Sequence, residues 1–523
     1  MEFREVAVVG LGTMGAGIAE VFARAGVQVV AIEADPAALS RGIKILDASL
    51  ARAVSRGRLT SQEQADIRGR VRPADGFDEA AGADLAIEAV PEQPEIKRQV
   101  FAELDRVCRP DAILVTNTSS LSVTAVAAAT RHPGRVAGMH FFNPAPVMRL
   151  VEVVTTVLAD PATQPAVAAL ATRLGKTPVQ VTDRAGFVAN ALLLPYLNHA
   201  VTLLETGFAG REDIDAAATG GIGLPMGPLT LLDLIGLDTS LSIMEVLRAE
   251  FGGTRYTPAP LLRRLVAAGR LGRKTGRGIY DYPPPQTASP ASIDRHNDAP
   301  GVPATVTLIG SGAGERSAAV VSGAAVSSAA QPDSHSAPGG DLAAALAAAG
   351  VDLAGPAGRG DLVLADLASA ADRLLPVALA SGQPGDVVGL HRAGADGGLA
   401  ELVGTPLTTP AAAAAGRALA AALGLTPVQA PDRPGFLVGT LLYPHLADAV
   451  RMVQDGYASA ADVDAAMTLG CGYPRGPLEL LDEIGPATAQ TVLAAMYQAD
   501  GDPAFAPPPL LAEHAAAGLG FRR

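Results

Sequence analysis

Short apolar runs separated by helix-length stretches organise the first part of the chain. Runs rich in Val, Ile and Leu occupy residues 6–9, 27–32, 85–90, 113–116, 136–140 and 150–154. Runs of this length are typical of buried strands, and their alternation with helical stretches predicts a parallel sheet covered by helices. From Gly186 to Tyr282 the apolar spacing is helical instead. We therefore place a domain boundary near residue 182.

The helical pattern occurs twice in the chain. The segment Gly175–Gly236 aligns without gaps with Gly424–Gly485, and about half of the aligned residues are identical. A stretch rich in proline lies between the two copies and predicts an extended linker. The expected domains are a first sheet domain 1–182, a helical domain 183–282, a linker 283–303, a second sheet domain 304–431 and a second helical domain 432–523. We call residues 1–282 the first half and residues 304–523 the second half.

The first apolar run leads directly into a glycine turn and a helix, Val6-Ala-Val-Val-Gly10-Leu-Gly12-Thr-Met-Gly15. Gly10 permits a tight turn, Gly12 lets backbone N–H groups approach a pyrophosphate, and Gly15 lets the helix pack closely on the strand. The second run ends in Glu33, where a carboxylate can bind the adenosine ribose and repel a 2′-phosphate. The pattern predicts NAD as the cofactor. The alternative, an ordinary glycine turn beside a surface glutamate, does not account for the agreement of all these features.

The corresponding turn of the second half is incomplete. Its sequence is Val306-Thr-Leu-Ile-Gly310-Ser-Gly-Ala-Gly314, and an Ala- and Ser-rich stretch follows it without a second strand that ends in an acid. We therefore expect the second sheet domain to be degenerate and NAD to bind the first half only.

Composition narrows the classes of function. The formal net charge of −13 argues against nucleic-acid and anionic-membrane partners. The chain has two cysteines, Cys108 and Cys471, which lack metal-ligand spacing and predict neither a disulfide framework nor a metal site. No uninterrupted apolar run reaches the roughly 18 residues of a membrane span, and the first strand begins too early for a signal peptide. We expect a cytoplasmic protein.

Two polar segments follow apolar runs of the first half, Asn117-Thr-Ser-Ser-Leu121 and His140-Phe-Phe-Asn-Pro144. Open parallel sheets bind ligands at the carboxyl ends of their strands, so Ser119 and His140 should lie on the cofactor side. Glu152, on the next run, could fix the tautomer of His140. A base paired with a carboxylate beside NAD predicts alcohol oxidation. Ser119 and Asn190 suit the substrate oxygen, although a helix cap and a surface amide are their alternative roles.

These motifs together resemble the short-chain L-3-hydroxyacyl-CoA dehydrogenase family. The similarity extends over residues 1–282 and rests on Gly10–Ala19, Glu88-Ala-Val-Pro-Glu92, Asn117–Leu121, His140–Pro144 and Gly223-Leu-Pro-Met-Gly-Pro-Leu229. The resemblance implies an α/β Rossmann domain that binds NAD, followed by an all-α helical domain. It also implies oxidation of an (S)-3-hydroxyacyl-CoA to a 3-oxoacyl-CoA, as in fatty-acid β-oxidation. The repeat extends this fold class to a duplicated arrangement whose second Rossmann-like domain is degenerate.

The resemblance also implies roles for individual residues. His140 would be the base and Glu152 its partner, Ser119 and Asn190 would contact the substrate oxygen, and Asn143 would steady the His140 loop. Implied cofactor contacts are Gly10, Gly12, Met14, Gly15, Glu33, Glu92, Lys97 and Asn117. The family usually has Asp where this chain has Glu33. Coenzyme A would meet Ser49, Arg56 and Ser119; the alternative for the basic residues near Arg56 is a solvated helix face.

Over its whole length the chain resembles the two-half bacterial form of the family. That form is associated with 3-hydroxybutyryl-CoA or 3-hydroxyadipyl-CoA, the latter in phenylacetate degradation. His391 and Glu401 align with His140 and Glu152, but Gly439 replaces Asn190, so we expect one active site per chain.

In single-half relatives the helical domains of two chains form a dimer. We therefore expect residues 432–523 to pack on 183–282 as a pseudo-dimer within one chain. Whether whole chains are monomers or homodimers stays open. Two other functions also stay open: a sugar-acid dehydrogenase of the L-gulonate type, and a non-catalytic structural protein that binds NAD.

Overall fold

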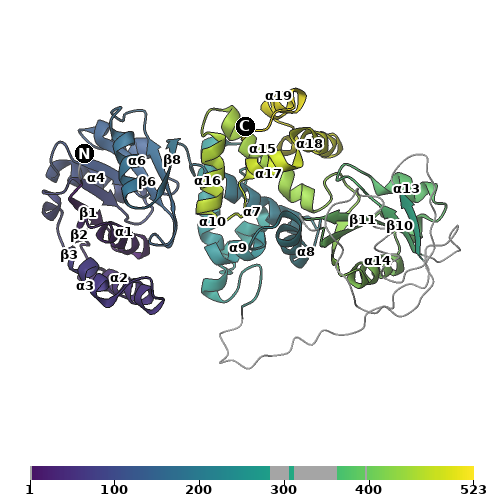
Figure 1. Cartoon of the computed structure of the whole chain (residues 1–523), viewed down its shortest axis with the longest axis horizontal. Helices are drawn as coiled ribbons and strands as arrows, with labels where there is room; N and C mark the ends of the chain where they lie inside the picture. The colour runs from purple at the N-terminus through teal and green to yellow at the C-terminus, as the bar shows by residue number, and fades with distance from the viewer. Residues whose placement is uncertain (1–2, 283–305, 311–361, 395–396, 523) are drawn as a thin grey trace.

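The computed structural model describes residues 3–282, 306–310, 362–394 and 397–522. They form three blocks in a row: a large sheet domain, a central helical block and a smaller sheet region (Figure 1). The predicted linker 283–303 and the incomplete glycine turn beyond Gly310 lie outside the described residues.

The first block is an eight-stranded sheet in the order β3-β2-β1-β4-β5-β6-β7-β8. Its strands are β1 (Glu5–Val9), β2 (Gln28–Ile32), β3 (Val71–Ala74), β4 (Leu85–Glu88), β5 (Ile113–Thr116), β6 (Val136–Phe141), β7 (Leu150–Thr155) and β8 (Thr177–Thr182). Its helices are α1 (Thr13–Arg24), α2 (Pro36–Ser55), α3 (Ser61–Gly69), α4 (Pro94–Val107), α5 (Val123–Ala127) and α6 (Thr163–Arg173). The prediction of a Rossmann-like sheet with helices is confirmed for this part of the chain.

One pair of strands departs from the predicted parallel sheet, because β6 and β7 run antiparallel. The segment that joins them contains no helix. Without a crossover connection the chain can only turn back on itself, which makes neighbouring strands antiparallel. The resulting register places His140 directly opposite Glu152.

Alternate residues of the strands face opposite layers of helices. On β1, Val6 and Val8 belong to the apolar cluster formed with α1, α2 and α6. Ala7 and Val9 belong to the cluster formed with α4 and α5. The sheet is therefore covered on both faces, as its continuous apolar runs predict.

The central block contains helices from both ends of the chain. From the first half come α7 (Ala189–Glu205), α8 (Arg211–Ala216), the π-helix η3 (Ala217–Ile222), α9 (Pro228–Ile235), α10 (Leu237–Phe251) and α11 (Pro260–Ala267). From the second half come α15 (Val438–Gln454), α16 (Ala460–Gly470), α17 (Pro477–Ile484), α18 (Pro486–Asp500) and α19 (Pro509–Ala517).

The smaller sheet has the order β13-β12-β11-β10-β9 within the described residues. Its strands are β9 (Val306–Gly310), β10 (Leu362–Asp366), β11 (Val387–Ala393), β12 (Leu399–Gly404) and β13 (Thr426–Pro431), with α13 (Leu374–Ala380) and α14 (Pro410–Ala422). Strands β11 and β12 are antiparallel with His391 opposite Glu401, which repeats the β6–β7 register. Strand β9 lies beside β10, in the place that β4 takes beside β5. A second region that contains a sheet is therefore present, and its described part has fewer strands than the first sheet.

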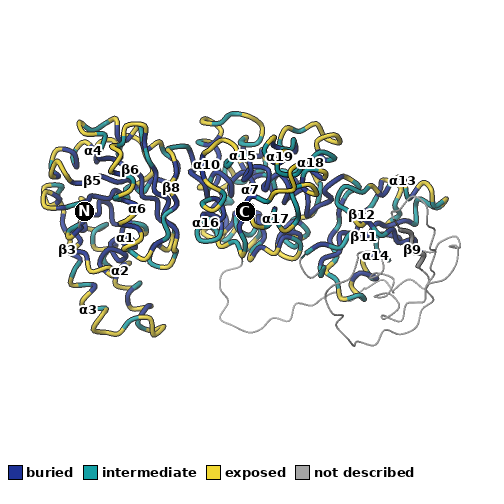
Figure 2. The backbone as a smooth tube through the Cα atoms, turned by 45° about the horizontal axis from the view of Figure 1, so that its top comes forward, coloured by how far each residue is buried: buried dark blue, intermediate teal, exposed yellow. Residues whose placement is uncertain are grey.

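The two helical parts share one apolar core. One cluster includes Leu192 and Leu197 of α7 together with Leu441 and Leu446 of α15, and Figure 2 shows buried backbone running through the middle of this block. The charged group of Arg255 also bonds Asp448, with a closest N–O distance of 2.6 Å. Residues 183–282 and 432–522 thus pack together within one chain.

The contacts between the halves are reciprocal. Arg184 Cζ lies 4.9 Å from the ring centroid of Tyr457. Its counterpart, Arg433 Cζ, lies 6.0 Å from the ring centroid of Phe208. Reciprocal contacts of this kind are what a two-fold interface produces.

Among the described helices, none is both long and apolar enough to cross a bilayer.

Candidate active site

The glycine turn after β1 is closely packed on one side and open on the other. Gly10 has a φ of +89°, and a Cβ added to Gly15 would lie 1.8 Å from the Gly10 carbonyl oxygen, so only glycine fits both positions. By contrast, no atom beyond Gly12 and its neighbours along the chain lies within 4 Å of the position that a Cβ on Gly12 would take. Gly12 caps α1 without a side-chain hydrogen bond to the helix N–H groups. The turn therefore has the shape and the donors that a dinucleotide phosphate needs.

Glu33 lies beside this turn at the end of β2. Its Oε2 accepts a hydrogen bond from the Leu11 N–H at 3.1 Å, which ties the carboxylate to the glycine turn. Met14 is partly buried against the apolar cluster under α1. Glu33 thus lies at the glycine turn, and its contact with the ribose stays a prediction.

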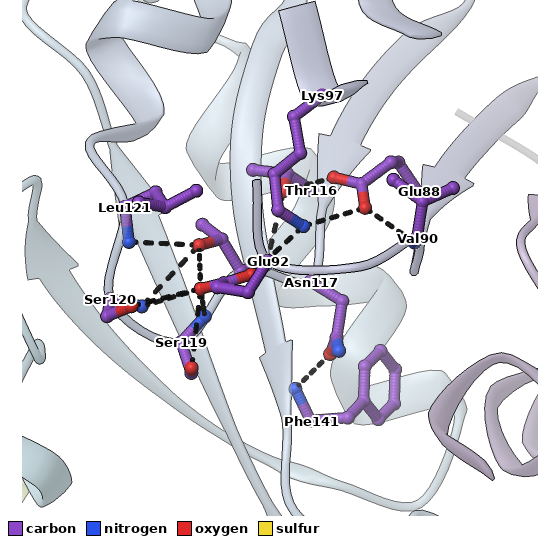
Figure 3. Close-up of polar contacts among 11 residues, drawn as sticks. Glu88, Val90, Glu92, Lys97, Thr116, Asn117, Ser119, Ser120, Leu121 and Phe141 are labelled. Atoms are coloured by element: carbon purple, nitrogen blue, oxygen red, sulfur yellow. Dashed lines mark hydrogen bonds and ion pairs between the residues drawn. The ribbon is translucent and has the colours of Figure 1, made fainter. Parts of the chain in front are cut away.

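Lys97 and Glu92 belong to a polar cluster at the ends of β4 and β5 (Figure 3). Lys97 is 1% exposed, and its Nζ lies 2.7 Å from Glu88 Oε1 and 3.1 Å from Glu92 Oε2. Glu92 Oε1 in turn accepts hydrogen bonds from Thr118, Ser119 and Ser120. The cluster therefore clamps the loop 117–121. Lys97 is enclosed by its two carboxylates, whereas the Glu92 side chain is 37% exposed.

The charge state of Glu92 follows from this cluster. Burial raises the pKa of its carboxyl, but the charge of Lys97 and the hydrogen bond from Thr118 outweigh that effect and hold the pKa below its ordinary value. Glu92 is therefore ionised at neutral pH.

Three predicted residues meet around the loop 117–121. Asn190 Nδ2 donates to the Ser119 carbonyl at 3.4 Å, so the two candidate oxygen ligands are neighbours. Asn117 Oδ1 accepts the Phe141 N–H at 2.8 Å, as Figure 3 also shows. This bond ties the loop to the residue after His140. Asn143 is exposed and makes no side-chain hydrogen bond within the described residues, so its steadying role stays a prediction.

His140 and Glu152 form a buried pair. His140 is 6% exposed and Glu152 is fully buried, with His140 Nδ1 2.8 Å from Glu152 Oε2. A carboxylate accepts hydrogen bonds only, so this contact places the ring proton on Nδ1 and leaves Nε2 as the basic nitrogen. The other oxygen, Oε1, accepts the N–H groups of Val188 and Ala189 at 2.9 and 3.0 Å. These donors at the start of α7 compensate the buried negative charge.

Aromatic rings surround the same histidine. The ring centroid of His140 lies 4.6 Å from that of Phe142 and 5.6 Å from that of Phe187. Phe187 has a φ of +48°, an unfavourable conformation for a residue with a side chain. Strained backbone of this kind persists only where the surrounding structure requires it.

The second half repeats the pair without a counterpart of Asn190. His391 Nδ1 lies 2.7 Å from Glu401 Oε2, and Glu401 Oε1 accepts the N–H groups of Leu437 and Val438. At the position of Asn190, however, stands Gly439, where an added Cβ would lie 3.0 Å from the Tyr443 ring. A tyrosine ring therefore packs beside the position of the missing amide.

The predicted coenzyme A residues lie on a separate arm. Ser49 is half-buried on α2, and Arg56 is exposed and caps the C-terminus of that helix. Figure 1 shows α2 and α3 projecting from the sheet domain. The structure places both residues on this arm and not beside His140.

Sequence reasoning missed several residues that hold the site. Lys176 donates to the carbonyls of Ala145 and Met148 and so fastens the segment after His140, while burial lowers its pKa to about 8. Phe187 was missed as well, although the pattern Asp-Arg-X-Gly-Phe occurs in both halves, ending at Phe187 and Phe436. Both phenylalanines have positive φ angles, so the repeat itself was the available signal.

Among the described residues, no cluster of His, Cys, Asp and Glu has a metal-binding arrangement.

Comparison with known proteins agrees with this geometry. Residues 5–184 match the 3-hydroxyacyl-CoA dehydrogenase NAD binding domain. The C-terminal domain of the same family matches twice, at residues 186–282 and 435–522. The chain is 34% identical to a 3-hydroxyadipyl-CoA dehydrogenase of Escherichia coli (strain K12), over 99% of this chain and 98% of that protein.

Two further relatives differ in length. A probable 3-hydroxybutyryl-CoA dehydrogenase of Bacillus subtilis (strain 168) is 47% identical over 54% of this chain and 98% of its own length. A crystal structure of 3-hydroxybutyryl-CoA dehydrogenase from Escherichia coli K12 superposes with a TM-score of 0.78 at 31% identity and covers 99% of both chains. The first relative is about half as long as this chain, and the second matches both halves. The chain therefore belongs to the 3-hydroxyacyl-CoA dehydrogenase family.

Proposed function

We propose that this protein is an NAD-dependent dehydrogenase that oxidises an (S)-3-hydroxyacyl-CoA to the 3-oxoacyl-CoA. The observation that carries the proposal is the buried His140–Glu152 pair, 2.8 Å apart, in the same sheet domain as the open glycine turn. A sugar-acid dehydrogenase and a purely structural role are not favoured, because the relatives reported above are named as hydroxyacyl-CoA dehydrogenases.

His140 acts as the general base of this reaction. Its Nε2 takes the proton of the substrate hydroxyl, and the carboxylate of Glu152 stabilises the imidazolium that forms. General-base catalysis of this kind contributes about 10²–10⁴ in rate. When bound, NAD supplies the acceptor for the hydride.

Ser119 and Asn190 hold the substrate oxygen beside His140. Their proximity to each other, through the 3.4 Å contact of Asn190 Nδ2 with the Ser119 carbonyl, supports a shared role. The Gly10, Gly12 and Gly15 turn and Glu33 bind the cofactor phosphates and ribose, with Met14 and Asn117 alongside. Glu92 contacts the cofactor, and Lys97 acts through Glu92 as a positioning residue, because it is buried between two carboxylates.

The two halves arise from duplication, and only the first is catalytic. The matching strand registers, the paired dyads and the twofold match of the C-terminal family domain support this view. The proposed organisation is the four domains and the linker predicted from the sequence, and the packed helical domains form a pseudo-dimer within one chain.

The basic arm of α2 binds the coenzyme A moiety. We expect Arg56→Glu to raise KM for the acyl-CoA severalfold and to leave the Kd for NAD unchanged, because the substrate carries phosphates and Arg56 is exposed at the end of the arm. Steady-state kinetics and NAD titration measure both. Arg173→Glu makes the same change of charge on α6 and serves as the control. An unchanged KM in Arg56→Glu would remove this assignment.

The absorbance of NADH tests the proposed reaction directly. Purified protein with NAD should form NADH from 3-hydroxybutyryl-CoA or 3-hydroxyadipyl-CoA, and not from L-gulonate. A preference for 3-hydroxyadipyl-CoA would support the predicted link to phenylacetate degradation. Binding of NAD without turnover of any of the three would contradict the proposed activity and favour the structural role.

A further inference from the structure

The second half touches the candidate active site of the first half through the C-terminal end of α16. Gly470 is the last residue of this helix, and a Cβ added to it would lie 2.5 Å from Leu150 Cδ2 and 3.2 Å from Phe142 Cε1. Phe142 is the residue whose ring packs against His140 at 4.6 Å. A chain of contacts therefore runs from α16 through Phe142 to the imidazole.

We infer that Gly470 is a positioning residue for His140, so that the non-catalytic half of the chain completes the catalytic site of the other half. This inference rests on the proposed function, in which His140 is the base. Gly470 lets α16 approach Phe142 closely and confines the phenyl ring against the imidazole. The second half is then retained for catalysis as well as for covering the apolar core.

The surroundings leave little room for a side chain at Gly470. Leu150 is fully buried on β7, two residues before Glu152, so it cannot move outward into solvent. Phe142 is half-buried and is the neighbour that can shift. A methyl group at residue 470 therefore displaces the ring that packs on His140. Small displacements of catalytic groups cost as much as about 10²-fold in rate.

The reciprocal interface provides a matched control. Gly221, in the π-helix η3, is the counterpart of Gly470, and an added Cβ there would lie 2.5 Å from Val438 Cγ2 and 3.1 Å from Leu399 Cδ2. Val438 is one of the residues that donate to Glu401. Gly221→Ala therefore crowds the interface equally, but beside the His391–Glu401 pair.

Kinetics of the two variants test the inference. Gly470→Ala should lower kcat about tenfold with KM for the acyl-CoA and Kd for NAD within about twofold. Gly221→Ala should keep kcat near that of the unmodified protein, and it should lower Tm by about as much as Gly470→Ala does. Leu150→Val removes the closest clash, so the double variant Gly470→Ala/Leu150→Val should regain part of kcat. Equal kcat values in Gly470→Ala and Gly221→Ala would overturn the inference.

Two further measurements test the role of Gly470 independently of the substrate that the protein oxidises. The proton on His140 Nδ1, bonded to Glu152, should give a low-field NMR signal that needs no substrate, and loss of the signal in His140→Gln assigns it. This signal should move in Gly470→Ala and not in Gly221→Ala; an unmoved signal overturns the inference whatever the substrate. If Gly470→Ala does not fold, a second pair of variants replaces it. Leu150→Val alone should lower kcat about threefold, while its counterpart Leu399→Val should not. Equal kcat values in Leu150→Val and Leu399→Val would overturn the inference.

Discussion

Replacement of His140 by Gln is expected to lower kcat by about 10²–10⁴-fold, the range that a general base contributes. Glutamine can still bond Glu152, so the fully buried carboxylate keeps a partner and the sheet domain should stay folded. The amide cannot accept the hydroxyl proton at neutral pH. The Kd for NAD should stay within about twofold, because the glycine turn lies on other strands of the sheet. Stopped-flow or steady-state measurement of NADH formation, with NAD titration, gives both numbers.

The second half contains the ideal control for this experiment. His391→Gln makes the same change in a pair with nearly the same geometry, 2.7 Å between Nδ1 and Oε2. It should leave kcat unchanged, since Gly439 and Tyr443 stand where the first half has Asn190 and Leu194. The unmodified chain should also bind one equivalent of NAD. A His140→Gln variant that keeps most of its kcat, or a His391→Gln variant that loses it, would refute the assignment of the base to the first half.

Removal of residues 304–523 should convert the chain into a species that dimerises or aggregates. The helix α7 lies in the shared core with α15, and the tilted rings of Tyr196 and His445 pack with 5.0 Å between their centroids. Each large apolar side chain that loses its cover costs about 1.5–3 kcal/mol. A second copy of α7 can cover this face, because the two helical parts are related in sequence. Sedimentation of the truncated and full-length chains measures the change.

The activity of the truncated chain is informative as well. In a dimer, Gly221 of the second copy would take the place of Gly470 beside Phe142, so the dimeric fraction should turn over substrate. The Bacillus subtilis relative aligns over 98% of its own length with 282 residues of this chain, which is the length that the truncation leaves apart from the linker. A truncated protein that is monomeric, soluble and fully active would contradict both the covering role of the second half and the pseudo-dimer.

Much of the first half could be predicted from local pattern. The expected strand at residues 113–116 coincides with β5, and the boundary near residue 182 coincides with the end of β8. The pairing of β6 with β7 could not be predicted from alternation alone, because the rule of parallel strands assumes a helical crossover that is absent there. Lys97 shows a similar limit. The motif around Glu92 points to a contact with the cofactor, but burial between two carboxylates depends on how α4 packs across the sheet.

The sequence by itself determined the glycine turn and the repeat of the helical segments, and it pointed to His140 and Glu152 as the candidate base and its partner. These features depend on backbone freedom at glycine, on residue chemistry and on spacing along the chain, which are local properties. Tertiary structure alone decided that His140 faces Glu152 across an antiparallel pair and that Glu92 clamps the loop 117–121. It also brought Gly470, from the other end of the chain, against Phe142. Such contacts arise from the packing of segments far apart in sequence, and no local pattern records which surfaces will meet.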